Sequence, residues 1–271
     1  MSNPPSELAS GKLLLDRPAE AVARLEIRNP GKRNALDHEI LDAIAAALET
    51  LDEGIETRCV IITGSEGMFS AGYDIGDIPD DVFAEEAESL VAHPFSRAIE
   101  AVERFPFPTV AALNGHALGG GLELAVTCDL RVAGAGFKLG MPPGKLGLIY
   151  SHTGIQRFLD TVGPARTREL FFTGRNVSAE RAEQIGLVHE TVQRDQLEQH
   201  VVELAAEIAG NAPLSLKGNK RIIRELLTFP RLSENLEREL VELRMSSFLS
   251  EDFREGVKAF GEKRKPRWQG R

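Results

Sequence analysis

The stretch GHALGGGLELAVTCD, residues 115–129, places three consecutive glycines where a strand should pass into a helix. The preceding PTVAALNG is typical of a buried strand, and the apolar residues after the glycines predict a helix to about Cys128. Glycines at such a junction allow close approach of the backbone to a ligand, and the first amides of a helix are free donors. The Gly120 amide could therefore bind a developing oxyanion. The alternative is that the glycines serve only close packing of helix on strand.

Short predicted strands alternate with helices along most of the chain. Apolar runs predict strands near residues 12–16, 21–27, 59–64, 108–113, 129–134 and 186–190. A turn at Arg17-Pro18 should separate the first two strands, and residues 65–75 should form a loop.

The helices are predicted from apolar residues at helical spacing and from their caps. Asp37 is the expected N-cap of a helix that reaches Leu51. Another helix, entered from the acidic stretch 74–88, should end near Phe105. Further helices are expected over 153–161, 164–173 and 179–185, with three more between 193 and 260. The whole pattern indicates an α/β core over residues 1–190 and a C-terminal helical region over residues 191–271.

Composition narrows the possible functions. The net charge of -9 argues against a nucleic-acid partner, which requires a basic face. The two cysteines, Cys59 and Cys128, lie in apolar runs and are expected to be buried and reduced. The start MSNPPSELAS lacks the features of a signal peptide, no apolar run could span a membrane, and the histidines lack metal-site spacing. We therefore expect a cytoplasmic protein that uses neither a metal nor a membrane.

The segment LGMPPGKLGLIYS, residues 139–151, looks at first like a phosphate-binding loop. A phosphate loop needs four residues between its first glycine and its Gly-Lys pair, and then Ser or Thr. Here three residues separate Gly140 from Gly144, and Leu146 follows the lysine. Two prolines also remove amide donors. The sequence therefore predicts a stiffened turn that ends in Tyr150, without nucleotide binding.

Six motifs in order give the chain a resemblance to a known family. They are NPGKRNALD (29–37), FSAGYDI (69–75), GHALGGGLELAVTCD (115–129), TGIQRF (153–158), AERAEQIGLVHE (179–190) and EGVKAFGEKRKP (255–266). The chain resembles the crotonase, or enoyl-CoA hydratase/isomerase, superfamily. The resemblance implies a spiral of ββα units with a C-terminal helical trimerisation region, and a homo-oligomer that is a trimer or a hexamer. It also implies an acyl-CoA substrate whose coenzyme is the only cofactor-like group.

The resemblance also assigns the parts of the site. The amides of Tyr73 and Gly120 would bind the thioester oxygen as it becomes an enolate, which is the arrangement that stabilises developing charge. The coenzyme would lie against two loops and against the C-terminal region of a neighbouring subunit. The residues expected to contact it are Lys32, Arg33, Ala35, Ala71, Asp74, Ile75, Phe260 and Lys263.

The resemblance places one acid/base glutamate at Glu123 and leaves the position of the second to Pro143. No carboxylate occurs from Leu130 to Leu159, so a reaction that needs two carboxylates is in doubt. Methylmalonyl-CoA decarboxylases, a branch of the family, also have proline at that position, and their active-site tyrosine aligns with Tyr150. They carry histidine where this chain has Tyr73. Further agreement lies in Pro79, FPFPTV (105–110) and SEDFREGVKAFGEKRKP (250–266).

Three functions follow as hypotheses. The first is decarboxylation of a malonyl-type thioester, with Tyr150 orienting the substrate carboxylate. The second is hydration or double-bond isomerisation with Glu123 as the sole acid/base. The third is an acyl-CoA binder that is hydrolytic or has no catalytic activity. A purely structural role stays open for Tyr150 as a buried tyrosine and for Glu123 as a carboxylate favoured by the helix dipole.

Overall fold

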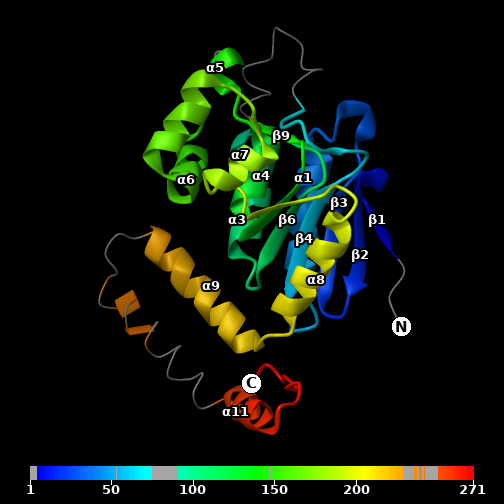
Figure 1. Ribbon diagram of the computed structural model, residues 1–271, viewed down its shortest axis with the longest axis vertical. Coiled ribbons are helices and arrows are strands. Elements are labelled where there is room, and N and C mark those ends of the chain that lie inside the picture. Colours follow the sequence, from blue (N-terminus) through cyan, green and yellow to red (C-terminus); the bar gives the residue numbers. More distant parts are fainter. Residues whose placement is uncertain are drawn as a thin grey trace.

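The larger of two sheets forms the centre of the computed structural model (Figure 1). The structure describes residues 5–52, 54–74, 91–146, 148–228, 233, 235–236, 238–239, 241 and 250–271. Within those residues the strand order of the larger sheet is β1-β2-β3-β4-β6-β8-β11. The first three strands pair antiparallel, and the pairs from β3 to β11 are parallel. The strands are β1 (Ser6–Leu8), β2 (Leu13–Ala19), β3 (Val22–Ile27), β4 (Cys59–Gly64), β6 (Thr109–Leu113), β8 (Leu130–Gly134) and β11 (Glu190–Val192).

A smaller sheet is built from the strands that follow those of the larger one. Its order in the described chain is β10-β9-β7-β5. The sequence β6, β7, α4 is one ββα unit, and β8, β9, α5 is the next, so the predicted repeat is present. The strands are β5 (Met68–Ser70), β7 (His116–Leu118), β9 (Lys138–Gly140) and β10 (Val177–Ser178).

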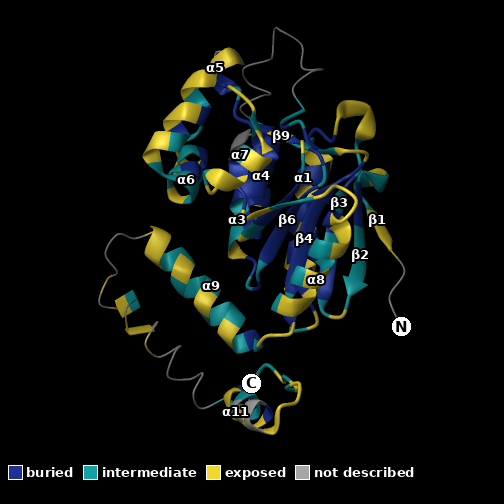
Figure 2. Ribbon diagram, viewed as in Figure 1, coloured by how far each residue is buried: buried dark blue, intermediate teal, exposed yellow. Residues whose placement is uncertain are grey.

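The larger sheet is buried on both faces because side chains of a strand alternate between them. In β4, Cys59 and Ile61 belong to the cluster that packs against α8 (Leu197–Ala209). Val60 and Ile62 point the other way, into the main core. That core lies under α1 (His38–Leu51), α3 (Ser96–Arg104) and α4 (Gly120–Thr127), and Figure 2 shows the strands as its buried centre.

Most predicted helices are confirmed. Asp37 caps α1, since its side chain accepts a hydrogen bond from the Ile40 amide at 2.9 Å. The two helices expected over 153–173 form α6 (His152–Thr173), which breaks at Gly163 with φ 70° and ψ 171°. The remaining described helices are α5 (Pro143–Leu146), α7 (Ala179–Gln184), α9 (Pro213–Thr228) and α11 (Glu251–Glu262), with short helical turns at Ala9–Gly11, Pro30–Lys32 and Val91–Phe95. The approach to α3 from residue 75 to residue 90 lies outside the described residues.

The predicted turn at Arg17-Pro18 is wrong. Strand β2 continues to Ala19, and the chain reverses at Glu20 and Ala21. Pro18 is tolerated because β1 pairs only with Leu13 to Leu15, and because the register with β3 shifts between Asp16 and Ala19.

Two other strand assignments also differ from the prediction. The stretch expected to be only a loop contains β5, which is three residues long and too short to show a period. The strand expected at 186–190 lies later, at β11, because Leu187 still donates to Ala182 to close α7. The predicted boundary at residue 190 therefore falls on a strand of the larger sheet, and the division into two regions stays a prediction.

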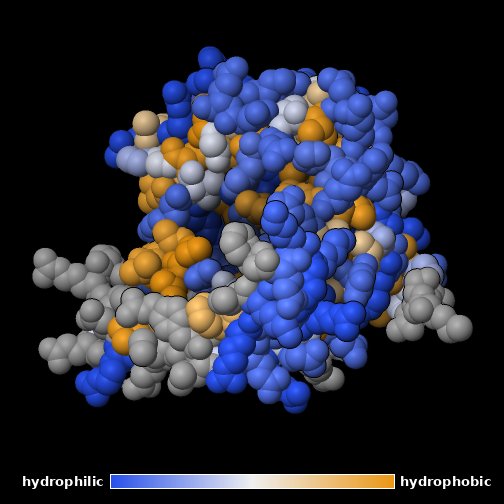
Figure 3. Space-filling model, turned by 60° about the horizontal axis from the view of Figure 1, so that its bottom comes forward, coloured by the Kyte–Doolittle hydropathy of each residue, from blue (hydrophilic) through white to orange (hydrophobic). Residues whose placement is uncertain are grey.

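Helix α9 has apolar side chains that the rest of the described chain leaves exposed. Ile223, Leu226 and Leu227 are each more than half exposed and lie on one helix face. Figure 3, which brings the lower side of the molecule forward, shows hydrophobic surface among the polar residues there. An apolar face of this kind is typical of an interface, and the predicted homo-oligomer stays a prediction. In the described part of the chain no helix has both the length and the apolar character needed to cross a bilayer.

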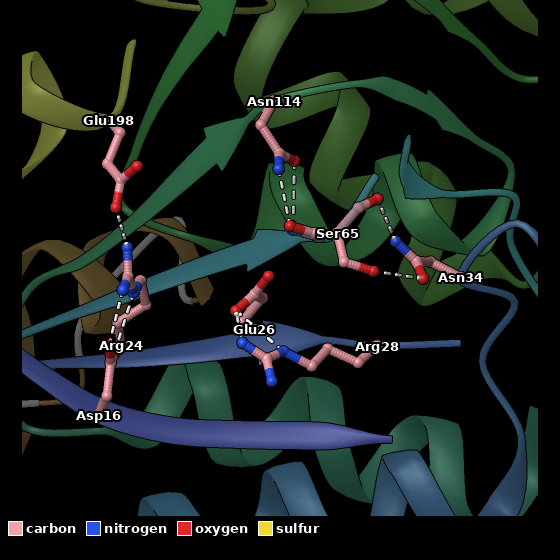
Figure 4. A network of polar contacts seen from close by, with 9 residues as sticks. Asp16, Arg24, Glu26, Arg28, Asn34, Ser65, Asn114 and Glu198 are labelled. Carbon is pink, nitrogen blue, oxygen red and sulfur yellow. Dashed lines mark hydrogen bonds and ion pairs between the residues drawn. The ribbon is translucent and has the colours of Figure 1, made fainter. Parts of the chain in front are cut away.

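Two asparagines, the buried Asn34 and the half-buried Asn114, hold the loops at the carboxyl ends of the parallel strands (Figure 4). The Asn34 amide nitrogen donates to the carbonyls of Ser65 and Met68 at 3.0 and 2.6 Å, and its oxygen accepts from the Asn29 amide at 2.8 Å. Asn114 exchanges hydrogen bonds with the amide and the carbonyl of Gly64. Asn34 fixes the loop after β3 to the loop after β4, and Asn114 fixes the segment after β6 to the end of β4.

The same view shows how α8 is fastened to the sheet. Arg24 of β3 binds both carboxylate oxygens of Asp16 at 2.9 and 2.6 Å and reaches Glu198 of α8 at 2.6 Å (Figure 4).

Replacing Asn34 by Ala should destabilise the fold by about 1–3 kcal/mol, because it leaves buried carbonyl groups without a donor. The free energy of unfolding in urea measures this. Asn211→Ala, at an exposed asparagine, is the control and should change it by less than about 0.5 kcal/mol. Equal losses in both variants would contradict the role given to Asn34.

Candidate active site

The strand-to-helix junction at 118–120 lies against the FSAG loop, and glycine makes the contact possible. A Cβ atom on Gly72 would lie 2.9 Å from the Leu118 carbonyl oxygen and 3.2 Å from the Gly120 amide nitrogen. One on Gly121 would lie 2.6 Å from the Ser70 carbonyl oxygen. Gly119 has φ 52° and ψ −125°, a conformation that residues with a side chain avoid. The two glycine-rich motifs predicted to form the site therefore meet.

Two backbone amides, those of Tyr73 and Gly120, lie at this contact. In the bridge between Leu36 and Tyr73, the Leu36 amide donates to the Gly72 carbonyl, and the Asp74 amide donates to the Leu36 carbonyl. The bridge therefore does not use the Tyr73 amide. Gly120 is the first residue of α4, where an amide has no partner within its own helix. Amides of this kind can bind an oxygen that becomes negatively charged.

The Tyr73 ring covers Gly120. A Cβ atom on Gly120 would lie only 2.4 Å from Cε1 of that ring. The ring also packs edge-on against Phe95, with 4.7 Å between centroids. Its hydroxyl lies 3.2 Å from the hydroxyl of Tyr150. The Tyr73 side chain thus joins the FSAG loop to Tyr150, at the end of the proline-stiffened turn.

Glu123 lies in the first turn of α4 and is buried, with 2% of its side chain exposed. The Tyr150 hydroxyl donates to its Oε2 at 2.5 Å, and Arg157 Nη1 donates to its Oε1 at 3.1 Å. Because the Tyr150 proton is directed at Glu123, Tyr73 must be the donor in the contact between the two hydroxyls. The structure thus brings Tyr73, Tyr150 and Glu123 into one hydrogen-bonded chain.

Burial influences the protonation of Glu123 and Tyr150 in this hydrogen-bonded series. It raises the pKa of Glu123, while the hydrogen bond from Tyr150 and the charge of Arg157 act to lower it. Burial also raises the pKa of Tyr150 well above its usual value, and the nearby Glu123 raises it further. Tyr150 is therefore a neutral donor at physiological pH. The raised pKa gives Glu123 an increased proton affinity, a property that is useful in a general acid/base.

The two loops predicted to bind the coenzyme lie side by side. The Ala71 amide donates to the Arg33 carbonyl at 3.1 Å, and Lys32 Nζ lies 2.7 Å from Asp74 Oδ2. Ala35 is buried, and it directly precedes Leu36, which forms the bridge to Tyr73.

The C-terminal part of the predicted coenzyme site is separate from these loops. Lys263 follows α11, which lies at the lower end of Figure 1, far from the two loops. The side chain of Phe260, and all of Ile75 and Pro79, lie outside the described residues. That a neighbouring subunit supplies Phe260 and Lys263 stays a prediction.

Sequence reasoning did not identify Arg157 and Glu103 as members of the site. Arg157 is the one charged residue in the TGIQRF motif, which was the available signal. Glu103 carries no motif, and only the packing of α3 brings it to Arg157 at 2.7 Å.

Comparisons with known proteins agree with this geometry. The sequence model of the Enoyl-CoA hydratase/isomerase family matches residues 17–271. The chain is 33% identical to the crotonyl-CoA hydratase of Syntrophomonas wolfei, over 95% of this chain and 98% of that one. It is 31% identical to the 2,3-dehydroadipyl-CoA hydratase of Escherichia coli (strain K12), over 93% and 96% of the two chains. The crystal structure of the enoyl-CoA hydratase from Bacillus anthracis superposes with a TM-score of 0.87 at 30% identity, covering 96% of this chain and all of that one (100%).

The chain therefore belongs to the enoyl-CoA hydratase/isomerase family, and its fold is the crotonase spiral that the resemblance implied.

Gly120→Ala should destabilise the protein, because the new methyl group would collide with the Tyr73 ring. In a Tyr73→Ala background the same change should cost less, giving a coupling free energy of about 0.5–3 kcal/mol in a double-mutant cycle of unfolding. Gly31→Ala is the control, since nothing lies within 4 Å of its added Cβ atom. Additive effects of the first two changes would contradict the contact.

Proposed function

We propose that this chain acts on enoyl-CoA thioesters by proton transfer through Glu123. The observation that supports the proposal best is the placement of Glu123: a buried carboxylate, with raised pKa, three residues after an amide that can bind the thioester oxygen. The loops at Lys32 and Ala71 would bind the coenzyme. Hydratases are among the relatives that the chain resembles over nearly its full length.

Isomerisation needs only what the described site contains. The Glu123 carboxylate would take a proton from C2 of a 3-enoyl-CoA, and the electron pair would move onto the thioester oxygen. The amides of Tyr73 and Gly120 would stabilise the resulting dienolate. Protonated Glu123 would return the same proton at C4, leaving the double bond between C2 and C3. One carboxylate carries one proton, so no second acid is required.

Hydration is the second candidate, favoured by the names of the relatives. It would add hydroxide to C3 and a proton to C2 of a 2-enoyl-CoA. With no carboxylate between Leu130 and Leu159, Glu123 would take the proton from water and then deliver it to C2. Tyr150 would hold Glu123 in place during both steps, through its short hydrogen bond.

Decarboxylation, our first expectation from the sequence, is not supported by the comparisons, because the relatives are named as hydratases. The site gives a physical reason to prefer the alternative. Tyr150 directs its proton at Glu123, so a substrate carboxylate in that place would lie beside a buried carboxylate. We retain methylmalonyl-CoA only as one arm of the test.

The test incubates the protein separately with a 3-enoyl-CoA, crotonyl-CoA and methylmalonyl-CoA and identifies the products by mass spectrometry. Glu123→Gln should lower isomerisation or hydration by roughly 10²–10⁴-fold, because the amide cannot carry the proton. Glu169→Gln, at an exposed carboxylate paired with Arg166, is the control and should match the parent. Loss of carbon dioxide from methylmalonyl-CoA with both enoyl-CoA substrates unchanged would overturn the proposal, and no product in any arm would indicate a binder.

The pH profile should show the environment of Glu123. Burial raises the pKa of Glu123, and only the ionised form accepts the proton. We therefore expect kcat/KM to have its maximum value above that raised pKa and to decrease as the pH falls through it. Tyr150→Phe removes a hydrogen bond that lowers this pKa, so the acid limb should move to higher pH. A limb that stays in place in Tyr150→Phe would contradict this role of the tyrosine.

A further inference from the structure

Two charged side chains lie behind Glu123 in a row that leads to the surface. Arg157, in the first half of α6, donates from Nη1 to Glu123 at 3.1 Å and from Nε to Glu103 of α3 at 2.7 Å. The exposed fraction of the side chain rises along the row, from 2% at Glu123 to 17% at Arg157 and 35% at Glu103. Charge alternates along it, from carboxylate to guanidinium to carboxylate.

We propose that Arg157 and Glu103 are positioning residues that fix the orientation of the Glu123 carboxylate, through the two hydrogen bonds that the Arg157 guanidinium donates. The catalytic part of this inference rests on the proposed function, in which Glu123 transfers the proton. The row itself rests on the contacts alone.

The orientation follows from how the two oxygens of Glu123 are held. Oε2 accepts from Tyr150 and Oε1 accepts from Arg157, so rotation of the carboxylate would break one of two charge-assisted hydrogen bonds. Arginine suits this place because its fork presents separate nitrogens to two carboxylates at once. The Nε bond to Glu103 keeps that fork from turning away.

Glycine at position 154 lets α6 come close enough for these contacts. A Cβ atom there would lie 2.6 Å from Cε1 of Tyr150 and 2.9 Å from Oε1 of Glu123. Arg157 follows three residues later, on the same side of the helix, and therefore reaches the carboxylate directly.

Two phenols, one cation and one further anion surround Glu123 in the described structure. Tyr73 and Tyr150 face it as neutral phenols, Arg157 is the cation beside it, and Glu103 is the second anion. Arg157 lowers the pKa of Glu123 and Glu103 raises it. Arg157 thus opposes the effect of burial, while Glu103 limits how firmly the guanidinium holds Glu123 in its ionised form.

The experiment titrates Glu123 directly, in the full chain and without substrate. Carbon-13 NMR of protein labelled at the glutamate carboxyl carbon follows each titration, and Glu123→Gln identifies the resonance by its absence. Arg157→Gln and Arg157→Met should move the midpoint of Glu123 to higher pH, because they remove the cation. Glu103→Gln should move it to lower pH, because it removes the second anion.

The controls use an ion pair on the same helix. Arg166→Gln and Glu169→Gln break an exposed pair whose nitrogen and oxygen lie 2.6 Å apart, and they should leave the Glu123 midpoint in place. If the Arg157 variants fail to fold, Glu103→Gln still tests the row through its shift to lower pH. A common loss of thermal stability with no shift of the midpoint, or shifts of the same sign at Arg157 and Glu103, would overturn the proposal.

Enzyme assays separate this inference from the proposed function. Opposite shifts in a protein that converts none of the thioesters would leave the row intact and reject the reaction. If the protein converts an enoyl-CoA but the Glu123 midpoint does not shift in any of the three variants, the proposed role of Arg157 and Glu103 is rejected and the proposed reaction stands. If both hold, the acid limb of kcat/KM should follow the NMR midpoints, and kcat at a fixed pH should change more than KM.

Discussion

The contact between the loop at Gly72 and the start of α4 is the constraint on which the site depends. Strands β5 and β7 pair in parallel in the small sheet, which brings the ends of the two glycine motifs together. The remaining separation is so short that a single methyl group at Gly72 or Gly121 would meet backbone atoms of the other segment. This approach places the amides of Tyr73 and Gly120 on neighbouring segments. The asparagine contacts at Asn34 and Asn114 then hold the flanking loops against the ends of the strands.

A second constraint is the cost of a carboxylate in an apolar core. Glu123 is surrounded by buried residues of α4, so an ionised side chain there needs partners for both oxygens. Tyr150, in the segment between α5 and α6, and Arg157, in α6, provide one donor each. Tyr150 can do so only while it keeps its proton, and burial ensures that it does. The polar chain and the apolar core therefore support each other: the core keeps water out, and the chain prevents an unpaired buried charge.

Sequence reasoning predicted the parts of this protein that depend on local pattern. The alternation of strands and helices, the Asp37 cap and the break before Pro164 all follow from rules that act within a few residues. The family motifs added the meeting of Tyr73 with Gly120, which no local rule supplies. The position of the turn after β2 was missed because Pro18 is tolerated where a neighbouring strand ends, and that depends on pairing with β1. Glu103 was missed for a similar reason, since only the packing of α3 on α4 and α6 brings it near the site.

The oxyanion donors of the proposed site belong to the backbone, whereas the groups that surround them are side chains. A mutation at position 73 therefore changes the side chain that covers Gly120 but keeps the donor, provided that the new residue is not proline. Tyr73 illustrates this separation. Its amide is the proposed donor to the thioester oxygen, whereas its hydroxyl contacts Tyr150. If the proposed role of the Tyr73 amide is correct, the side chain at this position could change in evolution without loss of the donor.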